Sequence, residues 1–329
     1  MDRAPRERRT PRRMFSIIAT MGLLAGMFAI AASPVGAKVA GANGQIVFDT
    51  GDDSRIFIAN PDGTHKHELV LPYPAFQAIW SPDGTRVLVA VFLPNGLARP
   101  ATVDPDGSHF KLLKVREAPK GADIVCKAWS PDGTHFLCSV QGTSMDGIYT
   151  IRASDGDDLT RLTTSPGDDP GDYSPDGTRF VFERHSGARH GSAALFVANA
   201  DGTGLRQIRP YGTANPHDDG VASWSPDGSE ILSASEHGLL FVIHPDGTGL
   251  RRIVLDTGGG WTFAVAPSWS PDGTSIVFSL TLYFGSTGQE DVYTARADGS
   301  HVAKVTDTPG DYSPNGERLP DWGTHPLTT

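Results

Sequence analysis

Trp80-Ser81-Pro82-Asp83-Gly84-Thr85 is the stretch that decides the fold, because it returns along the chain. Later copies begin at Trp129, Tyr173, Trp224 and Trp269, and a degenerate copy begins at Tyr312. Successive aromatic residues of the series are 43 to 51 residues apart. A period of that size is typical of repeat architectures, in which each repeat is one supersecondary unit that packs on its neighbours.

A second series of turns alternates with the first. It is an Asp-Gly pair after a short apolar run, at Asp62-Gly63, Asp106-Gly107, Asp155-Gly156, Asp201-Gly202, Asp246-Gly247 and Asp298-Gly299. The segments between turns are rich in alternating or β-branched residues, which is typical of strands. In one unit, strands are predicted at residues 125–129, 136–140, 148–152 and 159–163. Each unit is therefore expected to contain four strands.

The turn residues have defined conformational roles. Pro presets φ near −65° at the first central position, Asp tolerates the second, and Gly supplies the positive φ that leads into the returning strand. Six units of four antiparallel strands predict an all-β, six-bladed β-propeller over residues 44–323, after a linker at 38–43 and before a tail at 324–329. The aromatic residue before each turn is interpreted as an apolar plug between blades rather than a ligand contact.

The repeated turn, the β-branched run Ser275-Ile276-Val277-Phe278 and the run ending at Asp201-Gly202 resemble the WD-like repeat of TolB-type β-propellers. The resemblance covers about residues 44–322. It implies that the Ser-Pro turn joins the innermost strand A to strand B, so that the chain enters its first blade at strand B, residues 45–49. The missing strand A must then come from the C-terminus, with 319–322 or the copy at 312–316 as candidates. Pairing the two ends removes the open edges of the ring.

The net charge of −10 hides an asymmetry. The whole chain has 28 basic and 38 acidic residues, and without the first 37 it keeps 22 and 36, a net charge near −14. An acidic surface repels phosphate backbones, so nucleic acid is not expected as a partner. Cationic or metal partners remain compatible with this charge.

The N-terminus has the features of a secretory signal in residues 1–37. A basic segment, Arg3 to Arg13, precedes 19 apolar residues, 14–32, and small residues stand before Lys38. Arg12-Arg13 also resembles a twin-arginine signal, so the Sec and twin-arginine routes both stay open. An uncleaved anchor is the alternative, since 19 apolar residues can just span a bilayer. The expected location is periplasmic, cell-envelope or secreted, without stable membrane insertion after cleavage.

The propeller topology separates two sets of loops. A–B and C–D turns emerge on one face, which we call the turn face, and B–C and D–A loops emerge on the other, the variable face. Loops of varied composition on a rigid scaffold are where function is usually found. Polar candidates for the variable face are Asp123, Asp168, Asp169, Asp172, His185, Arg189, His190, His217, Asp218 and Asp219. Trp261 follows three glycines there and is predicted either to stack on a partner or to fold back onto the surface.

These polar residues allow two interpretations. Carboxylates with histidines can bind a divalent cation or act as acid and base, which predicts a metal-assisted hydrolase or lyase with His185, His190, His217, Asp218 and Asp219 near the channel mouth. The alternative is that they are solvated loop residues. EF-hand, H-E-x-x-H, G-x-S-x-G and P-loop motifs do not occur in the sequence.

The two cysteines, Cys126 and Cys138, lie on either side of one Ser-Pro turn and are each six residues from Asp132. An even pair in an exported protein favours a disulfide. Cross-strand bridges are geometrically tight, so two buried free thiols are the alternative.

The resemblance implies a non-catalytic module that holds another protein or a cell-envelope component, because TolB-like proteins serve as periplasmic docking scaffolds. In this reading the binding face includes Asp123, Asp168, Asp169, Arg189 and Trp261, no cofactor is expected, and the protein is a monomer. The rival hypothesis is the metal-assisted hydrolase or lyase, with a divalent cation as its cofactor.

Overall fold

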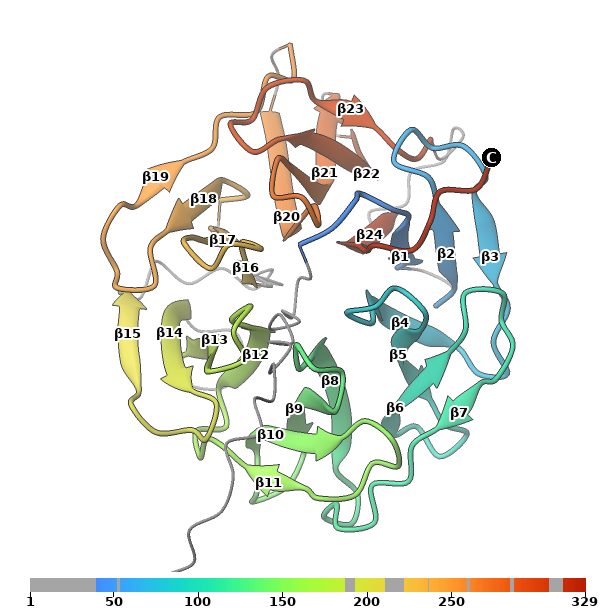
Figure 1. Cartoon of the computed structure of the whole chain (residues 1–329), viewed down its shortest axis with the longest axis vertical. Coiled ribbons are helices and arrows are strands. Elements are labelled where there is room, and N and C mark those ends of the chain that lie inside the picture. Colours follow the sequence, from blue (N-terminus) through green and yellow to red (C-terminus); the bar gives the residue numbers. More distant parts are fainter. Residues whose placement is uncertain are drawn as a thin grey trace, which may run out of the picture. The chain divides into compact units, whose positions relative to one another are not determined.

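Six four-stranded antiparallel sheets succeed one another around a central channel (Figure 1). The structure is a computed structural model that describes residues 40–51, 54–186, 193–210, 222–235, 237–258, 261–284, 287–307 and 316–329. We number the sheets as blades 1 to 6 from the blade that contains β1. The predicted six-bladed β-propeller is confirmed.

The two inner strands of each blade share the core with the third strand, which is also largely buried. The innermost strands, in blade order, are β24 (Glu317–Trp322), β4 (Ala75–Trp80), β8 (Asp123–Trp129), β12 (Asp168–Tyr173), β16 (Ser223–Trp224) and β20 (Trp261–Trp269). The second strands are β1 (Ile46–Thr50), β5 (Val87–Phe92), β9 (His135–Gln141), β13 (Arg179–His185), β17 (Ile231–Ala234) and β21 (Ser275–Phe284).

The outer strands shorten toward the rim. The third strands are β2 (Ile56–Ala59), β6 (Ala98–Val103), β10 (Gly147–Arg152), β14 (Ala193–Asn199), β18 (Leu240–Ile243) and β22 (Thr287–Arg296). The outermost strands are β3 (His67–Leu69), β7 (Lys111–Leu112), β11 (Thr160–Arg161), β15 (Arg206–Arg209), β19 (Arg251–Arg252) and β23 (Ala303–Lys304). These rim strands are short and mostly carry charged side chains, which opposes pairing with the edges of other molecules.

The ring closes in blade 1, where the last strand pairs with the first. Strand β24 runs antiparallel to β1, with Ile46 opposite Trp322 and Thr50 opposite Glu317. The expectation that residues 319–322 supply the missing strand A is therefore confirmed. The competing segment at 312–315 lies outside the described residues.

The aromatic residue that ends each inner strand is buried between two blades, as predicted. Tyr173 of blade 4, for example, packs with Leu137 and Ile148 of blade 3. Trp224 of blade 5 packs in the same way on Val181 of blade 4 and is fully buried. Because these rings fill the interfaces between blades, they hold the disc together and are not exposed to a ligand on the rim.

The Ser-Pro turns are locked by their aspartates. In the first copy Asp83 Oδ1 accepts from Ser81 Oγ at 2.7 Å, from Thr85 N–H at 3.0 Å and from Thr85 Oγ1 at 2.8 Å. Gly84 has φ of 67°, a conformation that residues with a Cβ adopt rarely. The serine is a further determinant, because Ser81 Oγ also accepts the Arg86 N–H at 2.9 Å.

The C-terminal residues after β24 stay attached to the turn face. Gln45 N–H donates to His325 O at 2.9 Å, and Thr328 N–H donates to Asn60 Oδ1 at 3.1 Å. We call residues 323–329 the C-terminal strap, since they join the turn faces of blades 1 and 2. Among the described residues, no helix is long and apolar enough to cross a membrane. The signal peptide and anchor readings concern residues 1–37, which lie outside the described part of the chain.

Candidate functional site

Asp168, a candidate from the sequence, begins inner strand β12 rather than lying in the preceding loop. Its carboxylate is buried and accepts two hydrogen bonds from Arg184 of β13, from Nε at 2.6 Å and from Nη2 at 2.9 Å. The Arg184 guanidinium also lies over the Phe196 ring, 4.8 Å from its centroid. A bidentate, buried pair of this kind holds two strands together, so Asp168 has a structural role in blade 4.

The neighbouring candidates are tied to the scaffold as well. Asp169 forms a half-buried ion pair with Lys127 of blade 3, which bridges two inner strands. Asp123 begins β8 and accepts the Ala98 N–H of blade 2 at 2.8 Å. Beside it, burial lowers the pKa of the Arg99 guanidinium, and the Asp123 charge acts in the opposite direction. These aspartates therefore connect adjacent blades, and their predicted part in binding stays a prediction.

His185 is the last residue of β13 and lies next to a buried glutamate. Its Nε2 is 4.0 Å from Glu183 Oε2, and both side chains are largely buried. Glu183 Oε1 is 3.5 Å from Ser233 Oγ of blade 5. Nδ1 of His185 is buried without a hydrogen-bond partner in the structure. His185 is thus the described member of the predicted acid–base group, and its neighbour Glu183 was not among the predicted residues.

The other members of that group, and one residue of the predicted binding face, belong to parts of the chain that the structure does not describe. Arg189, His190, His217, Asp218 and Asp219 lie outside the described residues. In the described ranges no three His, Cys, Asp or Glu side chains come together in a group suited to a metal ion. The metal site therefore stays a prediction that depends on residues 187–192 and 211–221.

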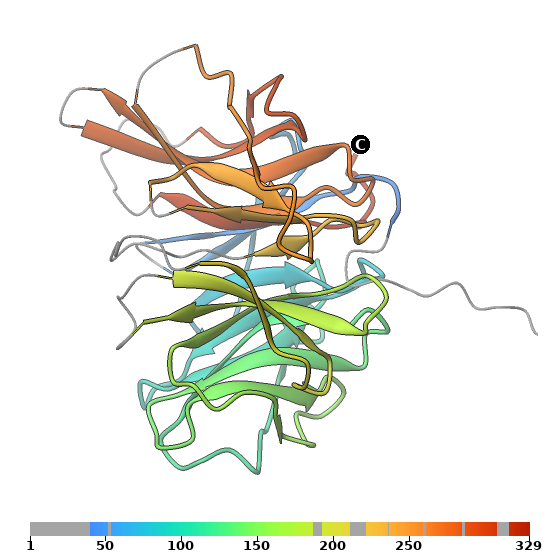
Figure 2. The ribbon, with the colours of Figure 1, turned by 90° about the vertical axis from the view of Figure 1, so that its left-hand side faces the viewer.

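Blade 6 extends further on the variable face than its neighbours. Strands β21 and β22 have ten residues each, against four to seven in the equivalent strands of the other blades. Their pairing continues to Phe284 opposite Thr287, and β20 joins it as far as Trp261 opposite Tyr283. Figure 2 shows this three-stranded extension reaching beyond the other blades on the side away from the C-terminus. Trp261, expected in a loop, is thus the first residue of an inner strand.

Blade 2 adds an exposed aromatic pair to the same face. Phe76, near the start of β4, stacks on Phe92, the last residue of β5, with ring centroids 4.7 Å apart. Phe92 is 41% exposed, and Phe76 is half-buried. Neither residue belongs to the repeated motif, so the sequence alone carries no signal for this pair.

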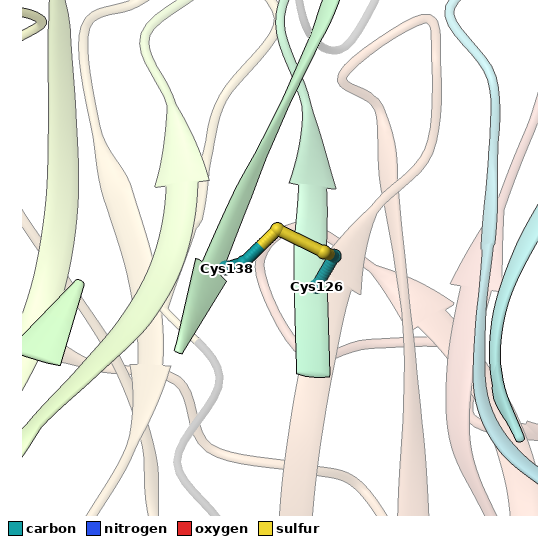
Figure 3. The surroundings of a disulfide bond; sticks show 2 residues. All are labelled: Cys126 and Cys138. Carbon is teal, nitrogen blue, oxygen red and sulfur yellow. A yellow bond between two sulfur atoms is a disulfide. The ribbon is translucent and has the colours of Figure 1, made fainter. Parts of the chain in front are cut away.

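Cys126 and Cys138 lie directly opposite each other on β8 and β9, and their sulfur atoms are joined in a disulfide (Figure 3). Both residues are buried in the interface between blades 2 and 3. The pairing register shifts just after Cys126, at a bulge between Cys126 and Ala128. The bridge thus links the two inner strands of blade 3 beside the channel.

No protein-family model matches the chain. A protein of Agrobacterium fabrum described as uncharacterised is 31% identical over 159 residues, which is 47% of this chain and 49% of that protein. The matched stretch thus spans about half of each chain.

Among solved structures, TolB from Acinetobacter baumannii superposes with a TM-score of 0.63 at 19% identity, over 85% of this chain and 66% of that one. A putative TolB from Agrobacterium tumefaciens gives a TM-score of 0.59 at 17% identity, over 84% and 92%. The tricorn protease gives 0.52 at 17% identity, over 82% of this chain but 27% of the protease. The chain therefore has the fold of the TolB-type six-bladed β-propellers, as the resemblance of its repeated turn predicts.

Proposed function

We propose that this protein is an exported, non-catalytic β-propeller that binds another protein or a cell-envelope component through its variable face. The observation that carries the proposal is the extension of blade 6. Three strands project above the ring there, and Trp261, Tyr283 and Phe284 belong to the projecting part. With strand residues about 3.3 Å apart, three extra residues raise the hairpin by about 10 Å. A projecting, aromatic-rich hairpin beside a flat disc is a shape suited to a macromolecular partner.

The described carboxylates support binding rather than catalysis. Asp123, Asp168 and Asp169 are each engaged by a neighbouring strand or blade, so they build a rigid platform. Exposed apolar area adds to this, because the Phe76–Phe92 pair lies on the same face as the blade 6 extension. Arg189 and Trp261 complete the proposed binding face.

The fold shared with the TolB structures supports the same class of function. Export is proposed on residues 1–37, by the Sec or the twin-arginine route, and the protein is proposed to act as a monomer. Neither its net charge of −10 nor its described surface favours nucleic acid.

Site-specific photo-crosslinking in the native envelope tests which face is used. A photoreactive phenylalanine analogue at Phe92 or Trp261 is expected to give a discrete adduct. Leu205 and Leu250 are the matched controls, since both are exposed apolar residues that follow C–D turns on the turn face. Adducts from the control positions alone would contradict binding through the variable face.

The second candidate function is a metal-assisted hydrolase or lyase. It is favoured by one observation, the buried pair of His185 and Glu183 at the end of β13. Metal analysis of the purified protein, with thermal melts in calcium, manganese and zinc, tests it. A bound ion that is lost on His185→Gln substitution would favour the metal-assisted enzyme. A metal-free protein whose melting temperature does not change with any of the three metals would exclude this function.

A further inference from the structure

The C-terminal strap is held on the turn face by residues of blades 1 and 2, which we call the strap site. Backbone hydrogen bonds fix its first half: Gly44 N–H donates to Gly323 O at 2.9 Å, and Gly323 N–H donates to Gln45 O at 3.1 Å. Gln45 N–H also donates to His325 O at 2.9 Å. Figure 1 shows the strap leaving β24 and ending near β2. These bonds use only main-chain atoms of the strap, so by themselves they bind an extended segment without selecting its sequence.

A buried side chain binds the strap's backbone a second time, near its end. Asn60 is 6% exposed, accepts the Thr328 N–H on Oδ1 at 3.1 Å and donates from Nδ2 to Thr328 O at 2.9 Å. Gln45 Nε2 adds a hydrogen bond to Thr328 Oγ1 at 3.2 Å. The N–H and C=O of one residue point to the same side in an extended chain, and the planar amide of Asn60 pairs with both. Asn60 is therefore placed to hold an extended peptide.

Two further contacts of the strap site select side chains. The His325 imidazole stacks on the Trp80 indole, with ring centroids 5.0 Å apart, and its Nδ1–H donates to Gly84 O. At Gly323, two residues before this ring, an added Cβ would lie 2.3 Å from Cγ of Trp80, so the position has room for glycine alone. The strap site therefore fits an extended segment of the pattern Gly-x-His.

The strap can leave its site without opening the disc. Its last four residues, 326–329, are exposed, and the apolar side chain of Leu327 is 49% exposed. Hydrogen bonds and one ring stack, rather than apolar burial, thus hold the strap in place. Segments with few buried apolar contacts open at a small cost in free energy. Ring closure does not depend on the strap, because β24 keeps its pairing with β1.

We infer that the strap site is a peptide-binding site which the strap keeps occupied, and that its partner is an extended Gly-x-His segment of another protein chain. The strap acts as a tethered competitor, because the tether gives it a high effective concentration at this site. A free peptide therefore binds only in proportion to the fraction of molecules whose strap has left the site. The strap site lies on the turn face, so it is separate from the variable-face binding proposed above and does not depend on it.

The test titrates a fluorescent peptide of the strap's own sequence, Gly-Thr-His-Pro-Leu-Thr-Thr, with the purified protein and follows fluorescence anisotropy. His325→Ala removes the ring stack and the hydrogen bond to Gly84 O. The variant is therefore expected to bind the peptide saturably and roughly tenfold more tightly than the unsubstituted protein, because more of its molecules have an empty strap site. His301→Ala is the matched control, since His301 is an exposed turn-face histidine whose ring contacts Ser300 and not the strap. It is expected to bind as weakly as the unsubstituted protein.

The selectivity of the site is tested on the His325→Ala protein. Alanine in place of the peptide's histidine or glycine is expected to weaken binding roughly fivefold or more, by losing the ring stack or by a clash with Trp80. Asn60→Asp, combined with His325→Ala, removes the Nδ2 donor and is expected to weaken binding as well; Asp104 is the equivalent residue of blade 2, so aspartate fits this position. Equal binding by the His325→Ala and unsubstituted proteins, no saturable binding by a cooperatively melting His325→Ala protein, or no effect of the peptide's histidine would overturn the inference.

Discussion

The imidazole of His325 stacks on the indole of Trp80, with ring centroids 5.0 Å apart and planes 7° from parallel. The same imidazole donates from Nδ1 to the Gly84 carbonyl at 2.8 Å, so that nitrogen carries a proton. His325 belongs to the C-terminal strap, and Trp80 ends the inner strand of blade 2. The strap thus covers the first copy of the repeated turn, and Gly84 has no room for a Cβ against His325 N.

Removal of the strap alone is expected to destabilise the protein, and removal of β24 with it to do so far more. Deleting residues 324–329, which are all of the strap except Gly323, loses the stack and several hydrogen bonds, about 2 kcal/mol together, which is about 4–8 °C in the melting temperature. Deleting 317–329 also opens blade 1 and uncovers the core at Trp322. Calorimetry of the two truncated chains measures both effects, and an unchanged melt for the longer deletion would refute the closure.

The aspartate of one Ser-Pro turn can be tested in blade 5. Asp227 accepts from Ser225 Oγ at 2.7 Å, Ser229 N–H at 3.0 Å and Ser229 Oγ at 2.7 Å. Asp227→Ala leaves these donors to water and is expected to lower the free energy of unfolding by about 1–3 kcal/mol. Asp227→Asn keeps one acceptor oxygen and is the matched control. Equal denaturant midpoints for the two variants would contradict the role of the acceptor.

Acid is expected to destabilise the propeller through the aspartates of both the Ser-Pro turns and the Asp-Gly turns. The hydrogen bond from Ser225 lowers the pKa of Asp227 below its ordinary value of 3.8, and hydrogen bonds from Thr64 and Thr203 do the same for Asp62 and Asp201. The unfolded chain therefore binds more protons near pH 4, so the turns stabilise the fold above that pH. The stabilisation is lost as the pH falls through the lower, folded pKa values.

Melting temperatures measured at successive pH values from neutrality downward check the direction of this pH dependence. The decline is expected to begin as the pH approaches 3.8, the ordinary pKa of these aspartates. Asp227→Asn removes one contributor and should make the decline shallower. A melting temperature that rises on acidification would be the opposite of the expected result.

The buried pair of Asp168 and Arg184 is expected to behave as a unit. Arg184→Met leaves the carboxylate buried with its main ionic partner gone, at a cost of about 3–5 kcal/mol. Asp168→Asn combined with Arg184→Met is expected to recover part of this loss, because no charge is then buried alone. Urea unfolding of the single and double variants measures the coupling, and strictly additive losses would show that the pair is not coupled.

The contribution of the disulfide to stability can be measured separately. Cys126 and Cys138 are 12 residues apart, and closing a loop of that size restricts the unfolded chain by about 3 kcal/mol in the entropic model. A reductant is therefore expected to lower the melting temperature of the native protein but not that of a Cys126→Ala, Cys138→Ala variant. Two titratable thiols in the unfolded, unreduced protein would contradict the bridge.

Much of this architecture follows from local sequence. The Ser-Pro-Asp-Gly turn forms its hydrogen bonds within six residues, so each copy of the motif predicts its own turn and the strands on either side. Repetition of the motif at 43 to 51 residues then predicts the number of blades. Even the pairing of a C-terminal segment with the first strand could be predicted, because a ring without closure would keep open edges. Local sequence left residues 312–316 and 319–322 as alternatives for this segment.

Contacts between blades could not be predicted from local sequence. The sequence suggested that Asp168 and Asp169 are loop residues facing a ligand, yet their partners, Arg184 and Lys127, are set by register and by the packing of blade 4 on blade 3. The strap, the extension of blade 6 and the pairing of Asp321 with Trp80 depend in the same way on chain segments that are distant in sequence.

The repeated motif by itself determined the turns, the strands and the count of blades, because its hydrogen bonds and backbone angles are local. Only the tertiary structure decided which residues join the blades, since contacts such as those of Asp169 with Lys127 and of Asp123 with the Ala98 N–H form only when neighbouring blades have packed. The same holds for the C-terminal strap, because the stack of His325 on Trp80 forms only when the last strand has paired with the first and has placed the chain end on the turn face.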